Sequence, residues 1–166
     1  MEMLLKIFSD KNVRYPAYQS GLVDKLTKTN GLNRSEESER YKPFSSVCEC
    51  FMYAAVIGLR TNYRLPFEQD SPGVWLQQIK YWEPADTVQY ITMGLLALAD
   101  FAFVELENLT EQEANQKAAE LVNLLETYAK GGFEIMEARI IDVPYYFEEP
   151  GNVVAFLQQL SAERAA

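Results

Sequence analysis

Residues 43–59 read PFSSVCECFMYAAVIGL, and the spacing of their apolar side chains decides the fold class. Small or apolar residues recur three and four positions apart on one side of a helix, namely Phe44, Val47, Phe51, Ala54, Ala55 and Gly58. Met52, Val56 and Leu59 widen that surface so far that we expect this helix to be central rather than peripheral. We expect Pro43 to begin it, because a first helical turn tolerates the missing N–H of proline.

Two further helices are predicted on either side of this segment. An apolar stripe follows Tyr15–Pro16, and Asn30–Gly31 is suited to end that helix in a left-handed conformation. On the C-terminal side, Asp86–Thr87 begins a helix that continues to Phe103 and is apolar nearly all round. A helix of that kind is typically buried, so we expect it at the centre of the domain.

A capping box marks the start of the next helix. Thr110 and Glu113 are spaced so that each side chain can bond the other residue's backbone N–H. The stripe that follows comprises Ala114, Ala118, Leu121, Val122, Leu125 and Tyr128. Gly131–Gly132 has no strand before it, so we interpret it as a helix stop rather than a phosphate-binding loop. Residues 133–140 then predict a separate short helix.

The C-terminal segment combines an extended stretch with a last helix. Residues 140–147 are rich in β-branched and aromatic side chains, but Pro144 limits them to an edge strand or an extended segment. A final helix is expected over 153–164, after Pro150–Gly151.

Two stretches read as connections. Residues 31–42 predict an exposed polar loop, and 61–85 form a connector rich in proline and aromatic residues. Within it, 74–81 is compatible with two turns of helix or with an extended strip. We therefore predict one all-α domain over residues 1–166, an irregular bundle of five to six helices with little or no sheet.

Composition indicates a soluble protein with a substantial core. The chain is 48% hydrophobic and 23% charged, as in an ordinary globular domain. No apolar run reaches the roughly 18 residues that a membrane helix needs. The first ten residues, MEMLLKIFSD, lack the cleavage site of a signal peptide. We therefore expect a cytoplasmic protein that does not contact a membrane.

The chain has no histidine, which removes imidazole zinc sites, Ser–His and Cys–His pairs and the commonest general base. Cys48 and Cys50 point apart on a helix, so we expect them to pack in the core, with a reactive or ligand role as the alternative. No catalytic, cofactor-binding or metal-ligating residue is predicted, and we expect no cofactor and no enzyme.

Asp100 is the one carboxylate in a strongly apolar setting. Burial of its charge is costly without a partner. We expect it at the edge of the bundle or paired with Arg60 or Arg64, and a functional carboxylate is the alternative.

Charge is unevenly distributed along the chain. Residues 1–80 hold 11 Lys/Arg and 9 Asp/Glu, whereas residues 81–166 hold 4 and 15. Such an acidic half is compatible with a surface that docks on a basic partner, or with one that only keeps the protein soluble.

Two sets of candidate binding residues follow. Candidate nucleic-acid contacts are Arg34, Arg40, Lys42, Arg60 and Arg64. Direct binding is possible but not favoured, because the calculated isoelectric point is near 4.6. Candidate interface anchors are Trp75, Tyr81, Trp82, Tyr145 and Tyr146. The alternative for these rings is packing over the ends of the bundle.

Two segments carry a resemblance to a known family. One is Lys42-Pro43-Phe44 followed by Ala54-Ala55-Val56-Ile57-Gly58-Leu59, and the other is Thr127-Tyr128-Ala129-Lys130-Gly131-Gly132-Phe133-Glu134-Ile135. Over about residues 15–140 the chain resembles the small Dnd-system-associated proteins, which are encoded beside bacterial DNA phosphorothioation genes. The resemblance implies an accessory role in a bacterial defence system, beside DNA-handling enzymes. Its motifs are structural, and they identify no catalytic residue.

Three hypotheses of function remain. The first is a non-catalytic adaptor of a DNA modification or defence system that acts by protein–protein contact, with a DNA-handling enzyme as a possible partner. The second is a DNA-binding regulator or an acidic DNA mimic. The third is an enzyme with a metal site built from carboxylates.

Overall fold

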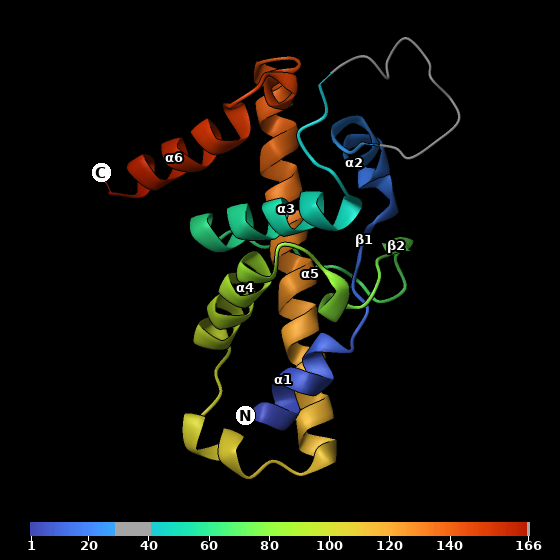
Figure 1. Cartoon of the computed structure of the whole chain (residues 1–166), viewed down its shortest axis with the longest axis vertical. Helices are drawn as coiled ribbons and strands as arrows, with labels where there is room; N and C mark the ends of the chain where they lie inside the picture. Colours follow the sequence, from blue (N-terminus) through green and yellow to red (C-terminus); the bar gives the residue numbers. More distant parts are fainter. Residues whose placement is uncertain (29–40, 166) are drawn as a thin grey trace.

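The computed structural model describes residues 1–28 and 41–165. In those ranges the chain forms six α-helices, four short 3₁₀ helices and one two-stranded sheet (Figure 1). The α-helices are α1 (Glu2–Ser9), α2 (Ser20–Leu26), α3 (Val47–Thr61), α4 (Ala85–Leu98), α5 (Glu111–Asp142) and α6 (Asn152–Ala165). The 3₁₀ helices are η1 (Ala17–Gln19), η3 (Ile79–Tyr81), η4 (Phe103–Glu107) and η5 (Tyr146–Glu148). The strands β1 (Arg14–Pro16) and β2 (Gly73–Trp75) pair antiparallel. The predicted all-α class is confirmed.

The crossing of α3 over α5 is the centre of the fold, and the two helices run across each other in Figure 1. Glycines on both helices allow their backbones to touch. A Cβ on Gly58 would lie 2.8 Å from the carbonyl carbon of Tyr128, and one on Gly132 would lie 2.5 Å from that of Ala54. These distances are shorter than any ordinary contact, so only glycine fits at either position.

Gly131–Gly132 therefore does not end a helix, and the prediction of a stop followed by a separate helix over 133–140 was wrong. Helix α5 continues through both glycines for 32 residues. Glycine lowers helix propensity by about 1 kcal/mol. Close packing against α3, and of Gly131 against the backbone of Tyr63, outweighs that local preference here.

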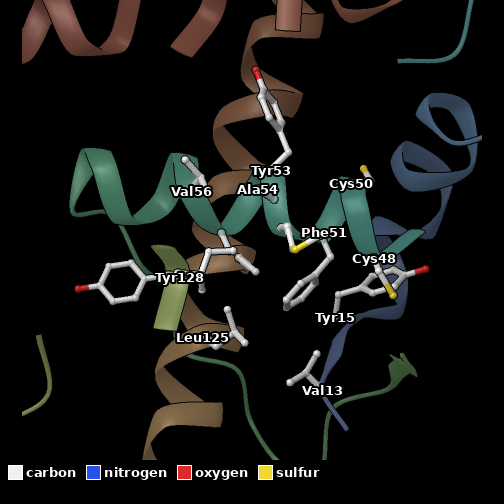
Figure 2. Close-up of a cluster of buried hydrophobic side chains, with 14 of the residues drawn as sticks. Val13, Tyr15, Cys48, Cys50, Phe51, Tyr53, Ala54, Val56, Leu125 and Tyr128 are labelled. Carbon is white, nitrogen blue, oxygen red and sulfur yellow. The ribbon is translucent and has the colours of Figure 1, made fainter. Parts of the chain in front are cut away.

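The predicted central position of residues 43–59 is confirmed, because every residue of α3 from Cys50 to Gly58 is buried. Figure 2 shows Phe51 on one side of this helix, beside Leu125 and Val13, and Tyr53 on the other. The predicted start at Pro43 was wrong. Ser46 caps the helix by accepting from the Glu49 N–H, whereas Phe44 is extended and its N–H donates to the Leu26 carbonyl at 3.1 Å.

Helix α4 is not the buried centre that its composition predicted. Only Ile91, Leu95 and Leu96 are buried, and they face α3 and α5. The helix ends at Leu98, before the predicted Phe103. Since α3 already occupies the centre, α4 packs beside it through one face and leaves the rest of its apolar surface exposed.

The N-terminal region differs from the predicted single helix after Tyr15–Pro16. Those two residues belong to β1, and a 3₁₀ turn separates them from α2. The predicted stop at Asn30–Gly31 lies outside the described residues, as does 31–40 of the predicted loop.

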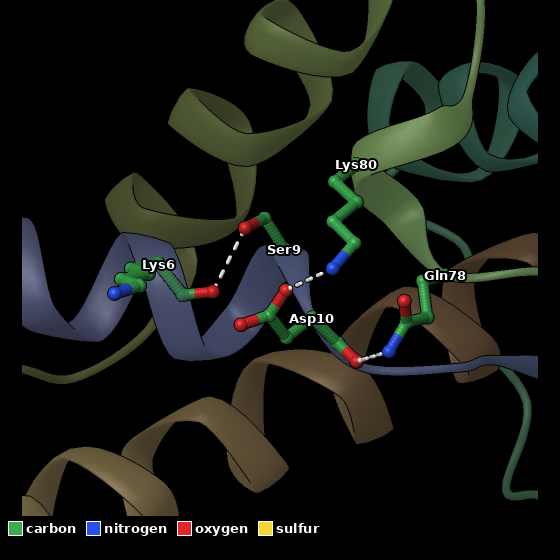
Figure 3. A network of polar contacts seen from close by, with 5 residues as sticks. All are labelled: Lys6, Ser9, Asp10, Gln78 and Lys80. Carbon is green, nitrogen blue, oxygen red and sulfur yellow. Dashed lines mark hydrogen bonds and ion pairs between the residues drawn. The ribbon is translucent and has the colours of Figure 1, made fainter.

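The connector 61–85 packs against the N-terminal segment through strand pairing and side-chain contacts. Residues 74–81 form neither two turns of α-helix nor one continuous extended strip: 74–75 belong to β2, which pairs with β1, and the single 3₁₀ turn η3 follows. The Lys80 ammonium lies 2.8 Å from the Asp10 carboxylate, and the Gln78 amide donates to the Asp10 carbonyl. Figure 3 shows both contacts as dashed lines. These contacts hold the end of α1 against η3.

At the C-terminal end, residues 140–147 do not form the predicted extended segment. Helix α5 continues to Asp142, and Tyr145 then adopts a left-handed conformation before η5. Pro144 restricts its predecessor to extended backbone, which explains why α5 stops there. The predicted last helix is present as α6. The Thr110–Glu113 capping box is also confirmed, with the Thr110 N–H 2.8 Å from the Glu113 carboxylate.

Candidate docking groove

A groove lies where α3, α4 and α6 meet. On the left of Figure 1, α6 lies above α3 and α4 lies below it. It has a volume of about 410 Å³. Met52, Tyr53 and Val56 of α3 contribute to its lining, and Val153 and Leu157 of α6 add further apolar surface. We call it the α3–α4–α6 groove.

The groove continues into a second hollow of about 390 Å³ through two shared residues, Arg60 and Tyr90. Leu160, Ser161 and Arg164 line the second hollow from α6. The two volumes together follow α6 over more than two helical turns. A space of this length matches the reach of a short helical or extended peptide segment.

Aromatic packing holds the first half of α6 beside the groove. Phe156 is buried, with its ring centroid 5.3 Å from that of Phe147 and 5.9 Å from that of Tyr146. The Tyr53 hydroxyl crosses from α3 and donates to the Val153 carbonyl at 2.7 Å. Burial raises the pKa of Tyr53, so it remains a neutral donor at physiological pH.

Two arginines make the far end of the groove positive. Arg60 Nη1 donates to Ser161 Oγ at 2.6 Å, and Arg164 Nη1 donates to the Arg60 carbonyl at 2.5 Å. Within the described ranges neither forms an ion pair, and the buried Arg60 Nε has no hydrogen-bond partner. An unpaired guanidinium in a partly apolar setting favours an incoming carboxylate.

An exposed apolar surface adjoins the groove through Tyr90. Met93 is 59% exposed, and Tyr90 and Leu98 are also about half exposed. We call these three residues the α4 outer face. Phe103 and Val104 on η4 add large exposed side chains beyond the end of α4. None of these residues is among the binding candidates predicted from the sequence. The sequence feature that could have identified them is an apolar surface too wide for one helix to bury.

The candidate interface anchors are distributed over two separate parts of the chain. Trp75 and Tyr81 are exposed on the connector, at β2 and η3. Tyr145 is exposed at the end of α5, and Tyr146 is partly buried against Phe156. Trp82 is only 3% exposed, so it is a core residue rather than a surface anchor. Its ring packs on the central helix, which the proline-rich sequence around it did not reveal.

The candidate nucleic-acid contacts do not converge. Arg34 and Arg40 lie outside the described residues. Lys42 Nζ donates to the Lys25 carbonyl at 2.6 Å, at the end of α2. Arg60 lines the groove, whereas the Arg64 guanidinium lies 5.9 Å from the Tyr128 ring centroid. The structure therefore assembles no basic patch from the described members of this set.

The described residues that could serve in catalysis or metal binding lie apart from one another. Cys48 and Cys50 are buried and unbonded to each other, and burial raises the pKa of Cys50 to about 12, so both pack as core residues as predicted. Asp100 is exposed and pairs with neither Arg60 nor Arg64, so the buried ion pair was wrong and the position at the edge of the bundle is confirmed. A functional role for this carboxylate stays a prediction. Among residues 1–28 and 41–165, no three Asp, Glu or Cys side chains gather as a metal would require. No helix in these ranges is long and apolar enough to cross a membrane.

Comparison with known protein families shows which family the chain matches. The family described as DNA sulphur modification system-associated protein 4 matches residues 12–163. The match extends beyond residues 15–140, over which the resemblance to Dnd-system-associated proteins was noted, and it confirms that resemblance. Searches of the curated proteins and of the solved structures found no match.

Proposed function

The chain belongs to the DNA sulphur modification system-associated protein 4 family, and on that premise we propose that it is a non-catalytic adaptor of such a system. In this proposal the α3–α4–α6 groove holds a segment of a protein partner from the same system. The residues of the groove bind and position that segment, and they perform no chemical step.

The observation that carries the proposal is the continuity of exposed apolar surface from the groove to the α4 outer face. Exposed apolar patches on folded proteins commonly mark interaction sites. Tyr90 belongs to both surfaces, and aromatic residues of this kind are enriched among binding hot spots. The peripheral position of α4 supports the same reading, because α4 buries only one of its faces.

The chemistry of the groove defines the segment that fits it. Apolar side chains would pack on Val56 and Leu157, in the manner of an amphipathic helix laid in a groove. A carboxylate on the same segment would meet Arg60 and Arg164, which have no acidic partner among the described residues. We therefore propose an amphipathic segment whose apolar side is followed by an acidic residue.

Affinity purification tests this proposal with two matched variants. Met93→Glu places a charge on the α4 outer face, whereas Val154→Glu places one on α6 at a residue that is equally exposed and lines neither hollow. We expect wild type and Val154→Glu to co-purify a protein encoded by the sulphur modification genes, and Met93→Glu to lose it. Leu157→Glu inside the groove should lose it as well.

Three outcomes would count against the adaptor. Retention of the partner by both Met93→Glu and Leu157→Glu would show that the partner binds another surface of the protein. Recovery of no sulphur modification protein by wild type would remove the adaptor role. Turnover of a substrate by the purified chain would contradict a non-catalytic function.

The acidic DNA mimic is a second candidate with its own observation. Exposed carboxylates gather around η4 and the start of α5, comprising Glu105, Glu107, Glu111, Glu113 and Glu120. Such a surface could occupy the DNA-binding site of a basic protein. Competition with duplex DNA for that protein, lost when these residues are replaced by glutamine, would support the mimic. A DNA-binding regulator would instead bind duplex DNA directly, with an affinity that falls steeply with salt.

A further inference from the structure

A hollow of about 390 Å³ lies between the β1–β2 pair and α5, and it shares no residue with the α3–α4–α6 groove. Its lining includes an indole, a phenyl ring, a guanidinium and a carboxyl group, from Trp75, Phe67, Arg14 and Glu126. The pairing of Arg14 with Trp75 in the two strands brings the guanidinium and the indole of this site together.

Trp75 is exposed in a way that the fold does not require. It is 65% exposed, whereas the chain's other tryptophan, Trp82, is buried in the core. The Arg14 guanidinium lies 4.2 Å from the Phe67 ring centroid and 5.8 Å from that of Trp75. Its N–H groups donate to the carbonyls of Glu68, Gln69 and Ser71. These bonds hold the Arg14 guanidinium in place beside the indole, which restrains the position of the Trp75 ring.

Glu126 provides a buried carboxyl group in the same hollow. It is 8% exposed, and its Oε1 accepts the Arg14 backbone N–H at 2.9 Å. The guanidinium of Arg14 is bonded elsewhere, so it forms no ion pair with this carboxylate. Within the described ranges, Glu126 Oε2 accepts no hydrogen bond. It is therefore an acceptor that a ligand can use.

A flat ring and a free acceptor together select a specific class of ligand. A planar molecule can stack on the exposed indole, since every nucleobase presents a π-face. An exocyclic amino group on its edge can donate to a carboxylate, whereas the N3–H of thymine lies between two carbonyl oxygens that a carboxylate repels. The Asn123 side-chain amide at the rim adds a donor and an acceptor for the remaining edge atoms. We infer that this hollow binds a nucleobase that carries an exocyclic amino group. The base stacks on Trp75, and its amino group donates to the Glu126 carboxylate.

The source of the base can be a DNA single strand or a free nucleotide, and both present the same edge to Glu126. Lys11, which lines the hollow, has only a 3.4 Å contact with Asn115 Oδ1 and remains available to a phosphate in either case. The inference does not depend on the adaptor role, because the two sites have no residue in common.

Fluorescence titration tests the inference, because only two tryptophans contribute and the buried Trp82 changes little on binding. The ligands are oligo(dA), oligo(dC) and oligo(dT), together with adenosine and thymidine monophosphates. We expect quenching by adenine and cytosine ligands, at least tenfold tighter than by thymine ligands. Preference for the oligonucleotides would identify a strand as the source, and preference for the monophosphates would identify a free nucleotide.

Three variants separate this site from non-specific binding. Trp75→Ala should weaken binding at least tenfold, measured by polarisation of a labelled oligonucleotide or nucleotide. Glu126→Gln retains an acceptor for the Arg14 N–H, so it should fold and bind but lose the discrimination against thymine. Tyr81→Ala removes an aromatic ring of similar exposure that does not line the hollow, and it should change nothing.

Several results would overturn the inference. These are binding that is equal for all bases, binding that Trp75→Ala leaves unchanged, or discrimination that survives in Glu126→Gln. Absence of any binding to strand and nucleotide alike would also overturn it, as would preference for an arginine-containing peptide over every nucleobase in the same titration.

Discussion

Replacing Gly132 by alanine should destabilise the protein, although alanine is the better helix former. The position lies inside α5, where alanine is worth about 1 kcal/mol more than glycine on propensity alone. The added Cβ, however, would lie 2.5 Å from the carbonyl carbon of Ala54 and 3.0 Å from its Cα. Both are backbone atoms of α3, so no side-chain rotation can relieve the overlap.

The overlap can be relieved only by moving α3 away from α5. Overpacking of a core costs about 1–3 kcal/mol, occasionally more, and separation would also loosen the contact at Gly58 on the same interface. Because the overlap is between two backbones, we place this cost at about 2–4 kcal/mol. After the gain of about 1 kcal/mol in propensity is subtracted, we expect a net loss of about 1–3 kcal/mol in the free energy of unfolding. In a chain of this length, that loss lowers Tm by about 2–12 °C.

Gly94→Ala provides the matched control. Gly94 also lies inside a helix, but its added Cβ would meet only Leu59 Cδ1, at an ordinary contact distance of 3.6 Å. We expect this variant to gain about 0.5–1 kcal/mol. Urea unfolding followed by circular dichroism measures both variants. A Gly132→Ala protein as stable as Gly94→Ala would refute the close contact between the two backbones.

Three more predictions concern individual side chains. Thr110→Ala should lose about 1 kcal/mol of unfolding free energy through its cap, and an unchanged urea midpoint would contradict the capping box. Cys50 should resist a thiol reagent in the native protein and react only in denaturant, because it is buried with a pKa of about 12; rapid native labelling of a Cys48→Ala variant would contradict this. Burial raises the pKa of Glu126 above its ordinary value of 4.5, so the folded state holds that proton more tightly than the unfolded state. The stability of wild type relative to Glu126→Gln should therefore rise as pH falls through the folded-state pKa towards 4.5, and thermal melts in which that difference stays constant or falls would contradict the buried carboxyl.

The candidate sites could be predicted only in part. Trp75 was identified as a binding candidate from its aromatic character, and it is exposed beside a hollow. Trp82 was identified by the same reasoning and is buried, because no local rule distinguishes two tryptophans in one proline-rich connector. Glu126 was missed altogether. It lies beside a stripe of ordinary helical spacing, directly after Leu125, and only the approach of β1 to α5 buries its carboxyl group.

Features that depend on neighbours along the chain can be predicted without the fold. The helical class, the capping box at Thr110 and the central role of α3 follow from spacing, and the family follows from the order of residues. Only the packing of the helices shows which side of α4 stays exposed and that Gly132 is a contact between α5 and α3 rather than a helix end. Gly132 lies inside the continuous helix α5, although glycine often ends a helix. Glycine is required there because the backbone of α3 occupies the space where a side chain would be.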